Sequence, residues 1–381
     1  MANIIGFART PFVPILGAFA QESSTSLGIS AVKGAISKGI VNANAIDTLV
    51  LSQVITGGTG PSPSRQISKG AGLPNTTKCM QINHLCTSGL KSVTIATDGI
   101  ALGKSQLTAV VGVESSSQSP YLLTKAREGG YGLGDGVLVD PLTSDGFSSP
   151  CMDPDTFLKH VKITNAELSQ YVQEMFQQTA ACYSDGIMQN EIIPVVVNRK
   201  NNHKYGGLWI TPPQQKVSED ILPKLHNPKN LSGSIKTICT LADGAACLLL
   251  ANDDFVNRLG ISPYARILSY CEESVDGSQF PKALVGVIKK IIAEVNHRVD
   301  LYDIMDQYAL LSVYASRNLD IDHSRINTNG STIAIGHPMG ATGIRQTISL
   351  VTALRARQLR YGCVAGTNLS GDAIAMLIEV C

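Results

Sequence analysis

One segment near the start of the chain combines a cysteine with the small residues that an accessible nucleophile needs. Cys86 lies in Asn83–Ser92, where an apolar strand pattern ends and a helical pattern begins. The partial positive charge at a helix N-terminus favours a thiolate, and the small side chains of Thr87 and Ser88 would leave the sulfur accessible. We therefore expect Cys86 to act as a nucleophile; the alternative is a buried structural cysteine.

A histidine far along the chain could supply the base that such a cysteine needs. His337 lies in Asn327–Gly343, whose four glycines predict tight turns and close approach of a ligand. Pro338 restricts His337 to an extended backbone, which suits a base presented from a loop. Histidine is the natural group to take the proton of a catalytic cysteine. The alternative is a histidine that only satisfies a hydrogen bond of its loop.

A second cysteine stands near the C-terminus, in a pattern typical of a strand end. Cys363 lies in Gly362–Thr367, at the end of an apolar run and before a turn. Because α/β proteins place their active sites at the carboxyl ends of parallel strands, Cys363 could be a second acid/base. The alternative is a cysteine in the core of the strand.

Composition narrows the class of protein. Hydrophobic residues make up 44% of the 381 residues and charged residues 16%, with a net charge of +1. This balance excludes a disordered chain, and we expect no nucleic-acid partner and no membrane insertion. No spacing typical of metal ligands occurs, so we expect no metal site. The nine scattered cysteines without an export signal predict reduced thiols and a cytoplasmic protein, although a processed mitochondrial protein would look the same.

Strand-like and helix-like segments alternate along the chain. The apolar runs Thr48–Val54, Thr108–Val113, Tyr361–Gly366 and Ala373–Val380 predict strands, and Gly89–Leu102, Asn165–Tyr183 and Gly343–Gln358 predict helices. Strand–helix–strand units of this size indicate an α/β fold with parallel strands. The unit around Cys86 and the unit around His337 share an order of turn, helix and strand, which indicates an internal repeat or generic α/β architecture.

Together these segments resemble thiolases, the acetyl-CoA acetyltransferases and 3-ketoacyl-CoA thiolases, nearly from end to end. Asn83–Lys91 is similar to the family's nucleophile segment, and Asn327–Arg345 to its Gly-rich His signature. The resemblance implies two pseudo-twofold-related α/β halves in an α-β-α-β-α arrangement plus a loop domain. The implied boundaries are 1–120 for the first part of the N-terminal half, 121–231 for the loop domain, 232–256 for completion of that half, and 257–381 for the C-terminal half.

The resemblance also implies roles for single residues. Cys86 would accept the acyl group, His337 would activate it, and Cys363 would move the proton at the α-carbon of the substrate. The backbone N–H groups of Cys86 and Ala365 would form an oxyanion hole. The resemblance implies coenzyme A or acyl-CoA as substrate, no permanently bound cofactor, a homodimer or homotetramer, and substrate contacts from Cys151, Met152, Cys239, Thr240, Met305, Gly336 and Gly366.

The sequence departs from the family pattern at positions that face the substrate. Met305 stands where the family's Asn-Glu-Ala-Phe element begins, and Cys363-Val364-Ala365 where it has Cys-x-Gly. We therefore keep as an alternative a thiolase-like acyl-CoA-binding protein with weak or no turnover. A decarboxylating condensing enzyme and a cysteine hydrolase are more distant alternatives. The leading prediction is thiolytic cleavage of a 3-ketoacyl-CoA, or Claisen condensation of acetyl-CoA, through an acyl-Cys86 intermediate.

Overall fold

The computed structural model describes residues 2–142, 157–197, 208–210, 238–295 and 298–381. Nine strands of this part follow one another across a single mixed sheet in the order β12-β13-β14-β11-β1-β10-β5-β3-β4, and β2 pairs with β10. The bounds of these strands are β1 Ala2–Arg9, β2 Val13–Pro14, β3 Thr48–Ser52, β4 Lys78–Ile82, β5 Leu107–Ser115, β10 Ala242–Ala251, β11 Ala265–Ser274, β12 Leu301–Ile304, β13 Tyr361–Thr367 and β14 Asp372–Val380.

The sheet consists of two halves with the same local pattern. In the first half β3 is parallel to β5, which is antiparallel to β10, which is antiparallel to β1. In the second half β12 is parallel to β13, and β14 and β11 follow in antiparallel order. The halves meet where β1 pairs antiparallel with β11. This correspondence is the twofold repeat that the sequence suggested.

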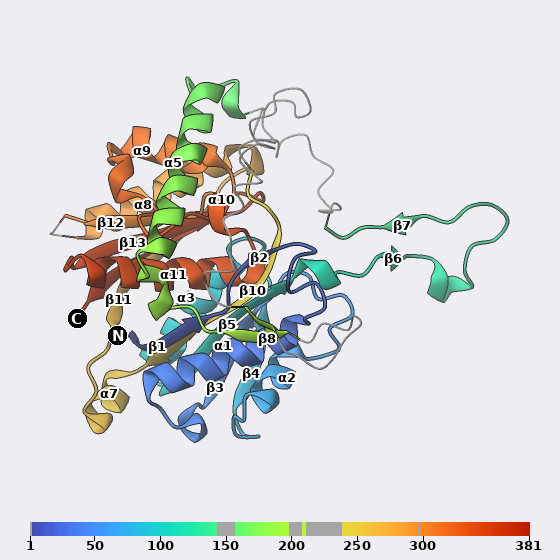
Figure 1. Ribbon diagram of the computed structural model, residues 1–381, viewed down its shortest axis with the longest axis horizontal. Coiled ribbons are helices and arrows are strands. Elements are labelled where there is room, and N and C mark those ends of the chain that lie inside the picture. Colours follow the sequence, from blue (N-terminus) through green and yellow to red (C-terminus); the bar gives the residue numbers. More distant parts are fainter. Residues whose placement is uncertain (1, 143–156, 198–207, 211–237, 296–297) are drawn as a thin grey trace.

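Helices form the other layers, as Figure 1 shows. Helices α3 (Ser88–Ala101) and α11 (Met339–Ala356) lie between the two half-sheets, because one apolar core joins Val93 and Ile348 of these helices to Val110 of β5 and Val364 of β13. On the outer faces, α1 (Ser24–Gly39) and α2 (Pro63–Gly70) cover the first half-sheet, and α8 (Phe280–Glu294) and α9 (Ala309–Leu319) the second. The layers therefore run α-β-α-β-α, as expected.

The two central helices touch through glycines. A Cβ at Gly343 of α11 would lie 2.5 Å from the backbone N of Leu90 in α3, and one at Gly340 would lie 2.5 Å from the backbone O of Ser52. No side chain fits there, so these glycines permit close approach of helices and strand ends. The sequence predicts that the helix begins at Gly343; in the structure it begins at Met339, so that His337 lies two residues before its first residue.

The remaining described elements cover one end of the molecule or extend from it. Helix α5 (Asn165–Ser184) begins with a capping box between Thr164 and Glu167 and packs on α9 and the short α10 (Thr332–Ile335). Strands β6 (Leu122–Leu123) and β7 (Leu138–Val139) form an extended hairpin that projects from the body in Figure 1. The last elements are α7 Asp253–Leu259, β8 Val195–Val197 and β9 Leu208–Ile210.

Within the described residues, no helix is both long and apolar enough to cross a membrane. The domain boundaries proposed from the sequence, with a loop domain over 121–231, stay a prediction.

Candidate active site

A cavity of about 550 Å³ opens between the two halves of the molecule, and Cys86 and His337 both line it. We call it the Cys86 cavity. Its walls come from the loop after β3, the loop before α3, the segment before β10, the start of α9 and the loop before α11. The lining residues are Val54, Ile55, Asn83, Leu85, Cys86, Pro141, Leu142, Ile238, Cys239, Leu241, Gln307, Tyr308, His337, Met339 and Leu369.

Cys86 lies two residues before the first residue of α3, on a loop in which Leu85 adopts a left-handed backbone with φ of 51°. Burial raises the pKa of the Cys86 thiol to about 12; a hydrogen bond from its own backbone N–H opposes this shift, and the interaction with Glu114 adds to it. The expected thiolate at a helix N-terminus is therefore wrong for the resting protein, because desolvation outweighs the helix dipole. Cys86 is a thiol at neutral pH and needs a base to react.

His337 has the protonation pattern of such a base. Its imidazole is 3% exposed, and burial together with the charge of Arg345 lowers its pKa to about 3, so the ring is neutral. The hydroxyl of Thr342 donates to the backbone O of Pro338 at 3.0 Å, and lies 2.7 Å from His337 Nδ1. With its one proton given to Pro338, Thr342 accepts from Nδ1–H, which leaves the lone pair on Nε2.

His337 Nε2 has no hydrogen-bond partner among the described residues, although it is buried. An unpartnered acceptor at a cavity wall is costly unless a ligand or a reacting proton uses it. The arrangement is suited to removing the proton of the Cys86 thiol as the sulfur attacks a carbonyl carbon.

The segment before β10 fixes His337 from the other side. The backbone N–H of His337 donates to the backbone O of Thr240 at 2.9 Å, and Leu241 forms a parallel bridge with His337. Gly336, with φ of 102°, makes the turn that brings His337 to this segment, and a Cβ there would lie 2.9 Å from Ala242 Cβ. Thr240 and Gly336 therefore position the imidazole through their backbones, whereas Cys239 lines the cavity itself.

Two residues that we did not predict also shape the cavity. Gln307 donates from Nε2 to the backbone O of Thr367 at 2.8 Å, and its buried Oε1 has no partner among the described residues. The fully buried carboxylate of Glu114 accepts from the backbone N–H groups of Val54, Ile55 and Gly340 at 3.0–3.1 Å. Burial raises the pKa of Glu114 to about 7. The sequence signal for Glu114 is a single acidic residue directly after an apolar strand pattern.

Comparison with known proteins now decides the family. The family models described as "Thiolase, N-terminal domain" and "Thiolase, C-terminal domain" match residues 2–254 and 261–380. The chain belongs to the thiolase family. A probable acetyl-CoA acetyltransferase of Dictyostelium discoideum is 30% identical over 388 residues, which cover 99% of this chain and 93% of that protein.

Solved thiolase structures share the whole fold. The acetyl-CoA acetyltransferase of Syntrophomonas wolfei superposes with a TM-score of 0.89 at 28% identity, over 100% of this chain and 99% of that chain. The Acat5 thiolase of Ascaris suum, solved in complex with coenzyme A, gives a TM-score of 0.86 at 26% identity and 100% coverage of both chains. The described residues therefore have the thiolase fold.

The position of Cys363 does not fit the acid/base role that we expected for it in this thiolase. Cys363 is 0% exposed and packs in the apolar core under α8, together with Ala365, whereas Val364 between them faces α11. Side chains of a strand alternate between the two faces of the sheet, so Cys363 points away from the central layer. It does not line the cavity that Cys86 and His337 share.

The oxyanion role expected for the backbone of Ala365 is not supported either. Ala365 lies inside β13, paired with Ile304 of β12 on one side and with Ala375 of β14 on the other. A backbone N–H of an interior strand lies in the plane of the sheet and points at a neighbouring strand. It is therefore not aimed into the Cys86 cavity.

Of the other residues expected to contact the substrate, Met305 and Gly366 lie away from the cavity, and two more lie outside the described residues. Met305 is 0% exposed in the central core, and a Cβ at Gly366 would lie 3.0 Å from both Met305 Cε and Leu90 Cδ1. Neither residue lines the cavity. Cys151 and Met152 lie outside the described residues.

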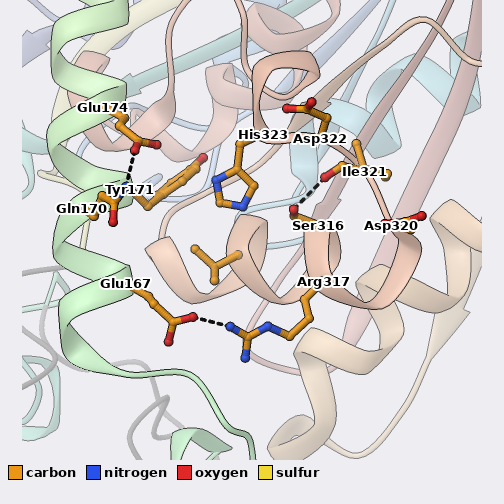
Figure 2. A pocket seen from close by; sticks show the side chains of 11 residues that line it. Glu167, Gln170, Tyr171, Glu174, Ser316, Arg317, Asp320, Ile321, Asp322 and His323 are labelled. Atoms are coloured by element: carbon orange, nitrogen blue, oxygen red, sulfur yellow. Dashed lines mark hydrogen bonds and ion pairs between the residues drawn. The ribbon is translucent and has the colours of Figure 1, made fainter.

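A second hollow of about 610 Å³ lies between α5 and α9 and is shown in Figure 2. We call it the α5/α9 groove. Four of its polar side chains bond in pairs: Glu167 pairs with Arg317, and Gln170 donates to Glu174 at 2.8 Å. At its base the hydroxyl of Tyr171 donates to the buried Asp306 at 2.9 Å. No group of three or more potential metal ligands occurs among the described residues, in this groove or elsewhere.

Proposed function

We propose that this thiolase is a CoA-dependent acyltransferase that cleaves a 3-ketoacyl-CoA with coenzyme A, or condenses two acetyl-CoA molecules, through an acyl-Cys86 intermediate. Its named relatives are acetyl-CoA acetyltransferases, and one related thiolase was solved with coenzyme A. The single observation that carries the proposal is that the Cys86 thiol and the unpartnered Nε2 of His337 line one cavity.

The first chemical step follows from the two resting protonation states. Cys86 is a thiol and His337 a neutral base, so a preformed thiolate–imidazolium pair is unfavourable. The thiol proton therefore passes to His337 Nε2 as the sulfur attacks the carbonyl carbon. The resulting imidazolium then lies next to the negatively charged oxygen that forms on the substrate.

The Glu114 carboxylate accepts hydrogen bonds from backbone N–H groups and thereby fixes the segments around the Cys86 cavity. It joins Val54 and Ile55, at the end of β3, to Gly340 at the start of α11. The loop that carries His337 is thereby fixed against the half of the protein that carries Cys86. Pre-organisation of this kind lowers the entropic cost of bringing the reacting groups together.

Two parts of the proposal concern assembly and location. We expect the chain to form homodimers or homotetramers, which sedimentation of the purified protein would measure. The expected cytoplasmic location stays a prediction.

Acyl exchange tests the proposal directly. Incubation with unlabelled acetyl-CoA and labelled coenzyme A should move label into acetyl-CoA, and Cys86→Ala should abolish this exchange. Acetoacetyl-CoA and longer 3-ketoacyl-CoAs should then be cleaved in the presence of coenzyme A. A wild-type protein that binds acyl-CoA but exchanges none with any chain length would support the binding-protein alternative instead.

A further inference from the structure

The proposed reaction needs a second proton-transfer group, and the structure removes the one we expected. When the bond between the α- and β-carbons breaks, the electron pair stays on the α-carbon, which must then receive a proton. His337 holds the proton of Cys86 at that moment. Cys363 lies on the outer face of β13, in the core under α8, and cannot supply the proton.

We propose that Cys239 is the acid/base that delivers and removes the proton at the α-carbon of the substrate. The inference rests on the proposed function and names a residue for it. Cys239 is half-buried and lines the same cavity as Cys86 and His337. Cys86 is among the groups that raise the pKa of Cys239, after burial, which agrees with their shared place on the cavity wall.

The backbone holds Cys239 between the two other functional segments. Its N–H donates to the backbone O of Gln307 at 2.9 Å, and the preceding Ile238 forms a bridge with Tyr308. Two residues further on, Leu241 forms a bridge with His337. Cys239 is therefore fixed on one side against the start of α9 and on the other against the histidine loop, with no flexible linker to either.

The protonation state of Cys239 suits an acid. Burial is the largest cause that raises the pKa of Cys239 well above its usual value, followed by electrostatic interactions with Cys86 and Asp306. Cys239 therefore carries its proton at rest and can give it to a carbanion, which is a far stronger base than a thiolate.

Among the described residues that line the cavity, Tyr308 is the other side chain that could transfer a proton. Its ring packs edge-on against Phe280 at a centroid distance of 6.0 Å, and it contacts the apolar cores around α8 and α5. The Tyr308 hydroxyl is therefore the alternative candidate for the proton-transfer role, and Tyr308→Phe serves as the comparison variant.

The proton balance of thiolysis closes with these three groups. The Cys86 thiol gives its proton to His337, the sulfur bonds to the β-carbon, and the bond between the α- and β-carbons breaks. The electron pair on the α-carbon takes the proton of Cys239, which releases acetyl-CoA. Coenzyme A then gives its thiol proton to the Cys239 thiolate and attacks the acyl-Cys86 thioester. The departing Cys86 sulfur recovers its proton from His337.

This scheme separates two half-reactions, because acyl exchange uses only Cys86 and His337. The experiment compares wild type with Cys239→Ala, Cys239→Ser, Tyr308→Phe and Cys363→Ala. Each is assayed for acyl exchange, for thiolysis of acetoacetyl-CoA, and for deuterium uptake into the methyl group of acetyl-CoA in heavy water. Cys239→Ala should retain acyl exchange to within about threefold and lose about 10²–10⁴-fold in thiolysis and deuterium uptake.

The outcomes distinguish this inference from the proposed function. Tyr308→Phe and Cys363→Ala should leave the ratio of the two half-reactions unchanged. If both Cys239 variants keep thiolysis and deuterium uptake, or if both lose acyl exchange to the same extent as thiolysis, Cys239 is not the acid/base. If Tyr308→Phe alone shows the selective loss, the assignment passes to Tyr308. A wild-type protein without acyl exchange would instead refute the proposed function.

Discussion

The Cys86 cavity and the α5/α9 groove have similar volumes, about 550 and 610 Å³, but they differ in what their polar groups do. In the groove, Glu167 bonds to Arg317, and Gln170 to Glu174. In the cavity, the buried Nε2 of His337 and Oε1 of Gln307 have no partner among the described residues. A buried unpaired polar atom costs about 1–3 kcal/mol, so these two atoms are available to a ligand or a reacting proton, whereas volume alone does not distinguish the two hollows.

Hydrogen bonds link the wall of the α5/α9 groove to the segment that precedes the histidine loop. Tyr171 lies in the groove, and its hydroxyl donates to Asp306, which also accepts from the backbone N–H of Thr332 at the start of α10. Gly336 and His337 directly follow α10. The groove thus supports the loop of the catalytic histidine from outside, while the reacting groups face the cavity.

The largest expected loss of rate comes from removing the base of the Cys86 cavity, His337. His337→Ala should lower the rate of thiolysis by about 10²–10⁴-fold, because the Cys86 thiol then has no group to take its proton. Steady-state kinetics on acetoacetyl-CoA and coenzyme A measure this loss, with circular dichroism as the control for folding. A variant that keeps more than about a tenth of the wild-type rate would show that another base serves Cys86.

The pH dependence of alkylation tests the resting state of the nucleophile. With the Cys86 pKa raised to about 12, its thiolate fraction grows tenfold for each pH unit throughout the neutral and mildly alkaline range. Inactivation by iodoacetamide should therefore accelerate about 10³-fold between about pH 7 and about pH 10 without a plateau. Peptide mapping must place the label on Cys86. A plateau near neutral pH would mean that Cys86 and His337 form a stable ion pair.

Substitution of Thr342 should lower the rate less than His337→Ala does, because Thr342 acts only by orienting His337. Thr342→Val removes the acceptor of the Nδ1 proton and allows the other tautomer, which should lower kcat about fivefold with little change in KM, since one hydrogen bond contributes about 1 kcal/mol. Thr342→Ser keeps the hydroxyl and should restore most of the rate. Equal losses in both variants would point to packing of the buried helix and not to the tautomer.

A substitution in the α5/α9 groove should have the smallest effect on the reaction rates. Glu174→Gln removes a carboxylate whose hydrogen bond is to Gln170, on the same helix, so the rates of thiolysis and acyl exchange should stay within about twofold of wild type. The same kinetic assays measure it. A loss comparable to that of Thr342→Val would mean that the groove takes part in the reaction and that the contrast between the two hollows is mistaken.

Local sequence signals were enough to single out Cys86 and His337 as candidate catalytic residues. Each is marked by small residues, glycine or proline next to a helix start, and the resemblance to thiolases joined the two segments. The alternation of apolar runs and helices predicted an α/β fold with parallel strands, and the resemblance to thiolases implied its layered arrangement. These features could be predicted because each depends on a few neighbouring residues and not on distant packing.

Features set by the tertiary structure were predicted wrongly or missed. The sequence predicts Cys363 at a strand end, but it lies inside β13, and the face it occupies depends on register, which a shift of one residue reverses. The raised pKa of Cys86 comes from burial by segments far away in the chain. Gln307 carries no local motif, and its exposure to the cavity became visible only when α9 was placed beside the segment before β10.

Trapping of the acyl-enzyme tests the central claim most directly. Wild-type protein incubated with acetyl-CoA, quenched in acid and digested should carry one acetyl group on the peptide that contains Cys86. Addition of coenzyme A before the quench should remove this acetyl group. The account is contradicted if the acetyl group is found on Cys239 or Cys363 instead, or if no cysteine is acetylated while the protein still turns over substrate.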